Sequence, residues 1–186
     1  PARSPLPTPP RLSSLPPALP ESPSAARELF RARPGPGYDE PMTKEYAPFE
    51  VVVAAAGASS RMGEWKLLLP CRGATVVEAT VADAIVAGLE AIVVAGYRAD
   101  ELEVLFQGRA GVRVVRNPAW ESGMASSMLA GLRSARGSAV FLMLADLPFA
   151  GSDPYRLLAD KRARRLEAGL PDAPLAAAFR GTKGHP

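Results

Sequence analysis

The chain has 186 residues, of which 47% are hydrophobic, and a formal net charge of +3. This size and composition suit one globular domain accompanied by additional sequence. The small positive charge, without a basic stripe interleaved with aromatic residues, argues against a nucleic-acid partner. A single cysteine and a single histidine exclude an internal disulfide and a zinc cluster built from these residues.

The first quarter of the chain differs in composition from the rest. Of the 20 prolines, 13 lie between Pro1 and Pro48, mixed with serine, arginine and glycine. Such a segment buries too little apolar surface to offset its ordering entropy. We therefore expect residues 1–46 to form a disordered arm and residues 47–186 to form the folded domain. The sequence shows neither a signal-peptide pattern nor an apolar run of membrane-spanning length, which predicts a cytoplasmic protein without a membrane partner.

The first predicted element is a buried strand that begins at Val51 and leads into a loop of small residues. The stretch at 51–70 reads VVVAAAGASSRMGEWKLLLP, and its β-branched start is typical of a parallel sheet. Small side chains let backbone N–H groups close on an anion. The small residues at this point are Ala55, Ala56, Gly57, Ala58, Ser59 and Ser60. Arg61 and Lys66 follow as two cations, so the stretch predicts a cradle for a polyphosphate. Its glycine spacing fits neither a dinucleotide site nor a P-loop.

Helix and strand patterns alternate over the rest of the chain. Helices are predicted at 76–87, from Asp100 to Gly108, through 124–132, and from Asp153, as N-cap, to near Gly169. Further strands are predicted at 91–96, 112–115, 139–146 and 174–179. This alternation predicts an α/β fold with a Rossmann-like, doubly wound and mostly parallel sheet that carries helices on both faces.

Two details of the helices carry specific expectations. Thr75 and Glu78 have the spacing of a capping box at the start of the first helix. Met124, Met128 and Leu132 recur at helical spacing, which predicts that they pack in the core rather than contact a cofactor.

Asp146 ends the most apolar of the predicted strands. In a doubly wound sheet the ligand lies at the carboxyl ends of the strands, so Asp146 is expected at the same edge as the loop after Val51. A carboxylate at the end of an apolar strand needs a partner to offset its desolvation. The partner could be a neighbouring arginine, a helix N-terminus, or Mg²⁺ bound through one or two carboxylates and substrate phosphates. The predicted phosphate cradle at this edge favours Mg²⁺.

Five motifs, in this order, resemble those of the molybdenum cofactor cytidylyltransferases, which are MobA-like NTP transferases. The motifs are GASSRMGEWKLLLP at 57–70, VVAGYRADEL at 93–102, NPAWESGMASSM at 117–128, ADLP at 145–148 and GTKGHP at 181–186. Together they make a specific match, whereas any one alone would be weak. The resemblance covers residues 49–186 and implies a fold of the nucleotide-diphospho-sugar transferase type.

This resemblance implies a reaction and a set of site residues. The terminal phosphate of molybdopterin would attack the α-phosphorus of CTP, releasing pyrophosphate and yielding a dinucleotide cofactor for a molybdenum hydroxylase. Residues 57–60 would donate backbone hydrogen bonds to the triphosphate, and Arg61 and Lys66 would neutralise its β- and γ-phosphates. Ala55 and Ala56 would belong to the same nucleotide site, and Asp146 would hold Mg²⁺. The resemblance places Asn117, Gly123, Ser126 and Ser127 against the base and ribose, and Gly184, His185 and Pro186 on the pterin side.

Some alternatives remain open at this point. The family pattern continues after its GHP motif with a late aspartate in a DxDTPxD-like stretch, which is expected to complete the metal site. This sequence stops at Pro186, so we expect it to lack the last strand and helix of the domain and the second metal carboxylate. A guanylyltransferase that uses GTP, or another small-molecule nucleotidyltransferase, is an alternative enzyme. A non-catalytic protein that carries the nucleotide or pterin to a hydroxylase is the alternative outside enzymes.

Overall fold

The computed structural model describes residues 49–58, 65–176, 178–179 and 182–183. Several predictions concern residues outside these ranges. They are the disordered arm at 1–46, the phosphate-loop residues Ser59, Ser60 and Arg61, and the pterin-side residues Gly184, His185 and Pro186.

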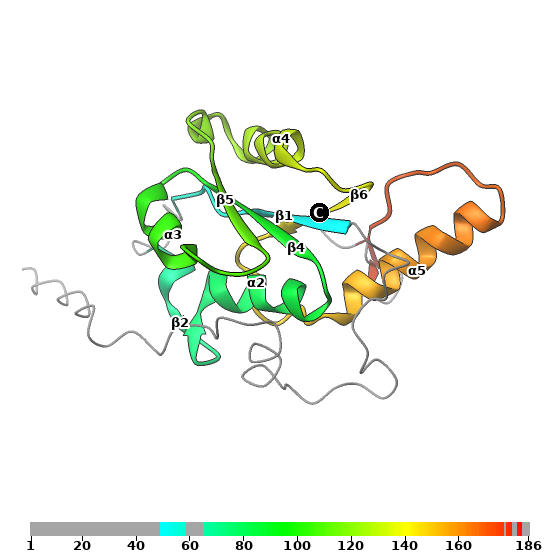
Figure 1. The fold of residues 1–186 in the computed structure, drawn as a ribbon, viewed down its shortest axis with the longest axis horizontal. Coiled ribbons are helices and arrows are strands. Elements are labelled where there is room, and N and C mark those ends of the chain that lie inside the picture. Colours follow the sequence, from blue (N-terminus) through cyan, green and yellow to red (C-terminus); the bar gives the residue numbers. More distant parts are fainter. Residues whose placement is uncertain (1–48, 59–64, 177, 180–181, 184–186) are drawn as a thin grey trace, which may run out of the picture.

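A parallel sheet of four strands forms the centre of the described chain (Figure 1). Its strands are β1 (Phe49–Ala54), β4 (Glu90–Ala95), β5 (Val112–Arg116) and β6 (Ala139–Leu144), in the order β5-β4-β1-β6. Val52 of β1 pairs with Ile92 of β4 on one side and with Leu142 of β6 on the other. The chain adds β4 and β5 outward from β1 and then returns to the opposite side of β1. The winding therefore reverses between β1 and β6, and ligands bind at the carboxyl ends of strands at such a switch point.

Helices cover both faces of this sheet (Figure 1). Helices α2 (Val76–Val86), α3 (Ala99–Phe106) and α5 (Asp153–Glu167) contribute to one core cluster, and α4 (Met124–Ser134) contributes to the other. Successive side chains of a strand point to opposite faces. Val51 and Val53 accordingly lie in the first cluster and Val52 in the second. The predicted α/β doubly wound fold is confirmed. Within the described residues, no helix combines the length and apolar character needed to cross a membrane.

Short elements connect the main ones. A 3-10 helix, η3 (Lys66–Leu68), is followed by a hairpin of β2 (Pro70–Cys71) and β3 (Ala74–Thr75), and a second 3-10 helix, η4 (Trp120–Ser122), precedes α4. The capping box predicted for α2 is present. The Glu78 N–H donates to Thr75 Oγ1 at 3.3 Å, and the Thr75 N–H donates to Glu78 Oε2 at 3.0 Å.

The predicted core role of three α4 residues is wrong for two of them. Met128 packs against the core, but Met124 and Leu132 are exposed. The buried residues of α4 are instead the small Ser127 and Gly131. A Cβ atom on Gly131 would lie 2.3 Å from Cγ1 of Val52. The helix thus lies too close to the sheet for large side chains at the positions of Ser127 and Gly131. The larger Met124 and Leu132 face outward.

The strand predictions need two corrections. The strand predicted at 139–146 ends at Leu144, and Leu142 is 44% exposed because β6 forms an edge of the sheet in the described part of the chain. The strand predicted at 174–179 is confirmed only at its end. Residues 174–176 are irregular, and β7 (Ala178–Phe179) pairs, among the described residues, with β8 (Thr182–Lys183) in an antiparallel sheet separate from the main one. Proline has no N–H to donate to a ladder, which disfavours pairing at Pro174.

Two helix starts differ from the predictions by one residue. Helix α3 begins at Ala99 instead of Asp100, after Arg98, which has a left-handed backbone (φ 52°). Helix α5 has Ser152 as its N-cap, so that Asp153 is already helical.

Candidate functional site

Two of the predicted charged residues meet at the carboxyl ends of β1 and β6. Lys66 opens η3, after the loop that leaves β1, and Asp146 follows the end of β6. Lys66 Nζ donates a hydrogen bond to Asp146 Oδ2 and forms an ion pair with it. The two side chains are 36% and 30% exposed. A pair at such exposure contributes about 0–1 kcal/mol, so each partner can be exchanged for a ligand group at little cost.

The first residues of the small-residue loop still hydrogen-bond to the neighbouring strand and its loop before the chain leaves the sheet. The Ala55 N–H donates to the Val94 carbonyl at 3.0 Å, and the Ala56 carbonyl accepts from the Tyr97 N–H at 3.0 Å. Both alanines are buried, whereas Gly57 is exposed, and no atom of the described residues lies within 4 Å of the position that its Cβ would take. Ala58 is half-buried. The chain therefore emerges from the core at Gly57, where its peptide groups become accessible to a ligand.

Trp65 connects Gly57 to the neighbouring β4 loop. Its indole Nε1–H donates to the Gly57 carbonyl at 2.9 Å. Its ring packs edge-on against Tyr97 at 5.7 Å between centroids, and the Arg98 guanidinium lies 4.9 Å from the ring centroid. Both contacts are of favourable types. Because Trp65 directly precedes Lys66, these contacts fix the position of Gly57 relative to Lys66. The sequence analysis did not predict this role, although an aromatic residue beside the lysine was the available signal.

Gly96 is the second residue that the sequence analysis missed. A Cβ atom there would lie 2.4 Å from Cβ of Trp120 and 2.8 Å from Cβ of Ala56. Trp120 also packs against Tyr97, with 5.8 Å between ring centroids. Gly96 therefore allows the loops after β1, β4 and β5 to pack together at one edge.

Three of the residues predicted to lie against the nucleoside form a hydrogen-bonded group at the end of β5. Asn117 Nδ2 donates to Ser126 Oγ at 2.9 Å and to Ser127 Oγ at 3.1 Å. Asn117 Oδ1 accepts from the Ala119 N–H at 3.0 Å. Gly123 precedes α4 with φ 102°, a left-handed backbone that favours glycine. These hydrogen bonds define the shape of the segment at 117–127 beside the site.

Asp146 supplies the kind of ligand that Mg²⁺ prefers, a carboxylate oxygen. No group of three or more His, Cys, Asp or Glu side chains that could hold a metal occurs within the ranges that the structure describes. The donor set fits a site with one protein carboxylate. At such a site Mg²⁺ takes its other oxygen ligands from substrate phosphates and water.

The sequence pattern of the MobA-like NTP transferase domain matches residues 51–186. The molybdenum cofactor cytidylyltransferase of Escherichia coli K12 is 29% identical over 130 residues, which cover 68% of either chain. The nicotine blue oxidoreductase of Paenarthrobacter nicotinovorans is 36% identical over 124 residues, covering 63% of this chain and 59% of that protein.

Solved structures agree with the sequence match. A nucleotidyl transferase from Methanothermobacter superposes with a TM-score of 0.57 at 40% identity, covering 61% of this chain and 57% of that one. Rv0371c from Mycobacterium tuberculosis H37Rv superposes with a TM-score of 0.51 at 30% identity, covering 67% and 61%. The chain thus spans between 57% and 68% of the length of these four relatives.

Proposed function

The chain belongs to the MobA-like NTP transferase family, and we propose that it is a nucleotidyltransferase that transfers CMP from CTP to molybdopterin. One observation carries the proposal for the site. The Lys66–Asp146 pair lies at the switch point of the sheet, where doubly wound folds bind their ligands, and Trp65, next to Lys66, hydrogen-bonds to Gly57. The 29% identity to a molybdenum cofactor cytidylyltransferase supports the choice of CTP and of the pterin acceptor.

The proposed reaction needs no nucleophile from the protein. A terminal phosphate oxygen of molybdopterin attacks the α-phosphorus of CTP and forms a new P–O bond. The bond between the α-phosphorus and the oxygen that bridges to the β-phosphate breaks, and pyrophosphate leaves with the electron pair. Catalysis of such a transfer depends on positioning and on neutralising charge.

The residues at the switch point have distinct roles in this proposal. Backbone N–H groups of residues 57–60 hold the triphosphate, and Lys66, together with Arg61, neutralises the charge that develops on the departing pyrophosphate. Asp146 would hold Mg²⁺, which supplies charge neutralisation at the phosphates when bound. The segment at 117–127 lies against the base and ribose, and the residues at 184–186 contact the pterin. The product would be a cytidine dinucleotide cofactor for a molybdenum hydroxylase, and the transferase itself would act in the cytoplasm.

The ion pair between Lys66 and Asp146 is compatible with these roles. When CTP and Mg²⁺ bind, the ammonium of Lys66 can move to a phosphate, and the carboxylate of Asp146 can move to the metal ion. Both charges then keep an opposite charge nearby, so the exchange does not leave a bare ion at the edge of the sheet.

The proposal is tested by measuring pyrophosphate release from CTP, GTP and ATP, each with and without molybdopterin. We expect release with CTP that requires molybdopterin and is lost in Asp146→Asn. Preference for GTP would indicate a guanylyltransferase instead. Nucleotide or pterin binding without any pyrophosphate release would indicate an accessory protein and would contradict the proposed transfer.

A further inference from the structure

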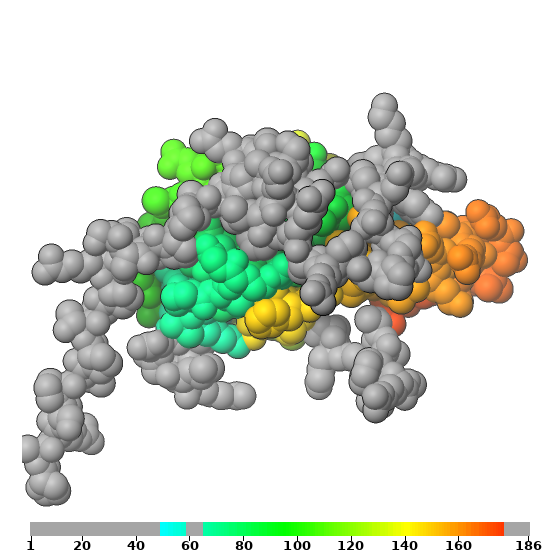
Figure 2. Space-filling view, turned by 90° about the horizontal axis from the view of Figure 1, so that it is seen from below, coloured from blue at the N-terminus to red at the C-terminus, as the bar shows by residue number. Residues whose placement is uncertain are grey.

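The segment that carries Asp146 is fastened to α2 and the β2–β3 hairpin on both sides of this residue. The Ala145 carbonyl accepts a hydrogen bond from Thr80 Oγ1 at 3.1 Å. On the other side of Asp146, the Pro148 carbonyl accepts a hydrogen bond from Arg72 Nη1. Figure 2 shows this segment, in yellow, beside the teal surface of α2 and the hairpin.

A buried ion pair lies at the centre of this connection. Arg72 Nη1 donates to Asp83 Oδ1 at 3.0 Å and to Oδ2 at 3.1 Å, and Oδ2 also accepts from the Gly151 N–H at 2.9 Å. The two side chains are 17% and 5% exposed. Burial raises the pKa of Asp83, and Arg72 and the Gly151 amide act against this by favouring the charged form. A buried carboxylate of this kind is stable only with its partners in place.

The backbone of Arg72 indicates that its side chain is needed at this position. Arg72 and Gly73 form the two-residue turn of the hairpin, with φ of 53° and 80°. Turns with two left-handed residues favour Asn, Asp or Gly at the first position. An arginine there is conformationally unfavourable and persists where its surroundings hold it. The contacts to Asp83 and to the Pro148 carbonyl help to hold it.

We infer that Arg72 and Asp83 are positioning residues that fix the 145–151 segment and thereby place Asp146 opposite Lys66. They act through the backbone at Pro148 and Gly151, because neither side chain hydrogen-bonds to Asp146 in the described contacts. The expected effect on turnover rests on the function proposed above. A misplacement of about 1 Å at a catalytic group can lower a rate by about 100-fold.

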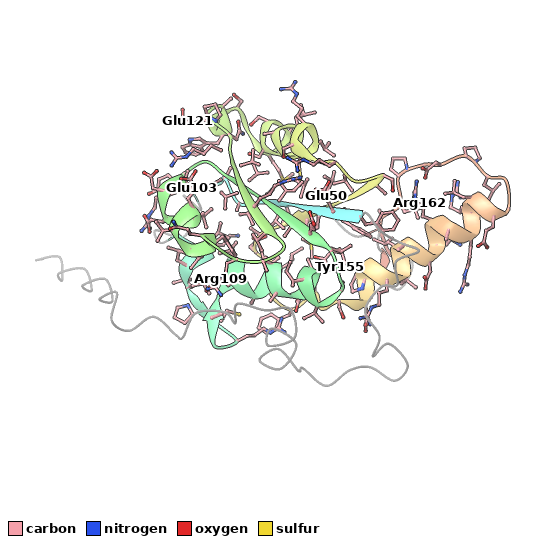
Figure 3. The ribbon with its side chains drawn as sticks, viewed as in Figure 1. Glu50, Glu103, Arg109, Glu121, Tyr155 and Arg162 are labelled. Carbon is pink, nitrogen blue, oxygen red and sulfur yellow. The ribbon has the colours of Figure 1, made fainter. Side chains whose placement is uncertain are left out.

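The chain offers a matched control for this inference, Glu50. Glu50 is 3% exposed and Asp83 is 4% exposed. Each carboxylate accepts from one arginine side chain and from the backbone. For Glu50 the donors are the Arg113 guanidinium and the backbone N–H groups of Arg136 and Gly137. Glu50 lies near the start of β1 (Figure 3), at the end of the strands opposite to Asp146.

The test compares Asp83→Asn with Glu50→Gln in the full chain. Asn keeps the shape of Asp83 but removes the negative charge that pairs with Arg72, and it has one acceptor oxygen where Asp83 has two. Amide hydrogen exchange is measured over residues 145–151, and kcat and KM for CTP are measured by pyrophosphate release. We expect Asp83→Asn to accelerate exchange in this segment and to lower kcat by about tenfold or more, with little change in KM. Glu50→Gln should leave both unchanged at temperatures where the variants are folded.

Two results would overturn the inference. One is exchange over 145–151 in Asp83→Asn that equals that of the wild type, and the other is faster exchange with unchanged kcat. If the wild type releases no pyrophosphate, the proposed function fails, and exchange alone decides whether Asp83 holds the segment. Should Asp83→Asn not fold, Arg72→Asn provides the second variant, because asparagine suits the left-handed turn while removing both side-chain contacts. The same faster exchange is expected for it, and unchanged exchange would count against the inference.

Discussion

Lys66 Nζ donates to Asp146 Oδ2, although the two residues are 80 positions apart in the sequence. The contact joins the loop that leaves β1 to the end of β6, the two strands between which the winding of the sheet reverses. A cation and a carboxylate are thereby held together where doubly wound folds bind ligands. We interpret this ion pair as the arrangement before the nucleotide binds. On binding, a phosphate of the triphosphate would replace Asp146 as the partner of Lys66, and a metal ion would replace Lys66 as the partner of Asp146.

Lys66→Ala should weaken binding of CTP more than binding of CMP. The ammonium is assigned to the β- and γ-phosphates, which CMP lacks, and a hydrogen bond to a charged group is worth about 1.5–3 kcal/mol. We expect a loss of CTP affinity of about 10-fold to 100-fold and little loss for CMP, measured by calorimetry. Equal losses for the two nucleotides would remove Lys66 from this role.

Gly131→Ala should destabilise the fold, although alanine is the better helix former. At an open position in a helix the change would gain up to about 1 kcal/mol. Here the new Cβ would lie 2.3 Å from a methyl group of Val52, and overpacking of a core costs about 1–3 kcal/mol. Chemical denaturation measures the difference, with the exposed Leu129→Ala on the same helix as a control of small expected effect. A stabilised Gly131→Ala would show that α4 does not approach the sheet this closely.

Tyr155→Phe should stabilise the protein. Tyr155 lies near the start of α5 (Figure 3) and is 3% exposed, and its buried hydroxyl has no hydrogen-bond partner among the described residues. Burial and the charge of Asp83 raise its pKa. Removing an unsatisfied buried hydroxyl is worth about 1 kcal/mol, and the edge-on contact with Phe141 at 5.3 Å remains. Urea denaturation that shows Tyr155→Phe to be less stable than the wild type would mean that the hydroxyl is hydrogen-bonded.

Glu50→Gln should remove a pH-dependent part of stability. Burial opposes the charge of Glu50, but hydrogen bonds from the Gly137 and Arg136 amides and the nearby Arg113 outweigh it and lower the pKa. Stability from a lowered pKa is present above the unfolded value of about 4.3 and is lost as pH falls through the folded pKa.

At pH 7 we therefore expect Glu50→Gln to lower the free energy of unfolding by about 1–3 kcal/mol. The difference from the wild type should shrink when the pH falls below about 4.3. Asp83 acts in the opposite direction because its pKa is raised, so the comparison with the variant isolates Glu50. A difference that stays constant between pH 7 and pH 3 would contradict the assignment.

Local patterns were sufficient to predict most of the fold. The valine run at 51–53 predicted the central strand, and Thr75 with Glu78 predicted the start of α2. The position of Asp146 at the end of an apolar strand predicted its edge of the sheet, and the structure brings it to Lys66. These features depend on residues close together in sequence and on the general topology of parallel sheets.

Features that depend on distant contacts could not be predicted in this way. The close approach of Gly131 to Val52 turned Met124 and Leu132 outward, and no periodicity within α4 reports it. The bond from Trp65 to Gly57 and the pairing of Arg72 with Asp83 join segments whose relation only the folded chain defines. Arginine is disfavoured at the left-handed turn position of Arg72, so turn preferences read from the sequence would not have identified this residue as important.

The most direct test of the proposed site is the Mg²⁺ dependence of CTP binding in the wild type and in Asp146→Asn. Asparagine keeps the shape of the side chain and removes the charge that holds the metal ion. Calorimetric titrations of both proteins with CTP, in the presence and absence of Mg²⁺, give the gain in affinity that the ion provides. We predict a clear gain for the wild type and almost none for Asp146→Asn, with equal thermal stability of the two proteins. An equal gain in both proteins would contradict the assignment of Asp146 and, with it, the proposed site at the ends of β1 and β6.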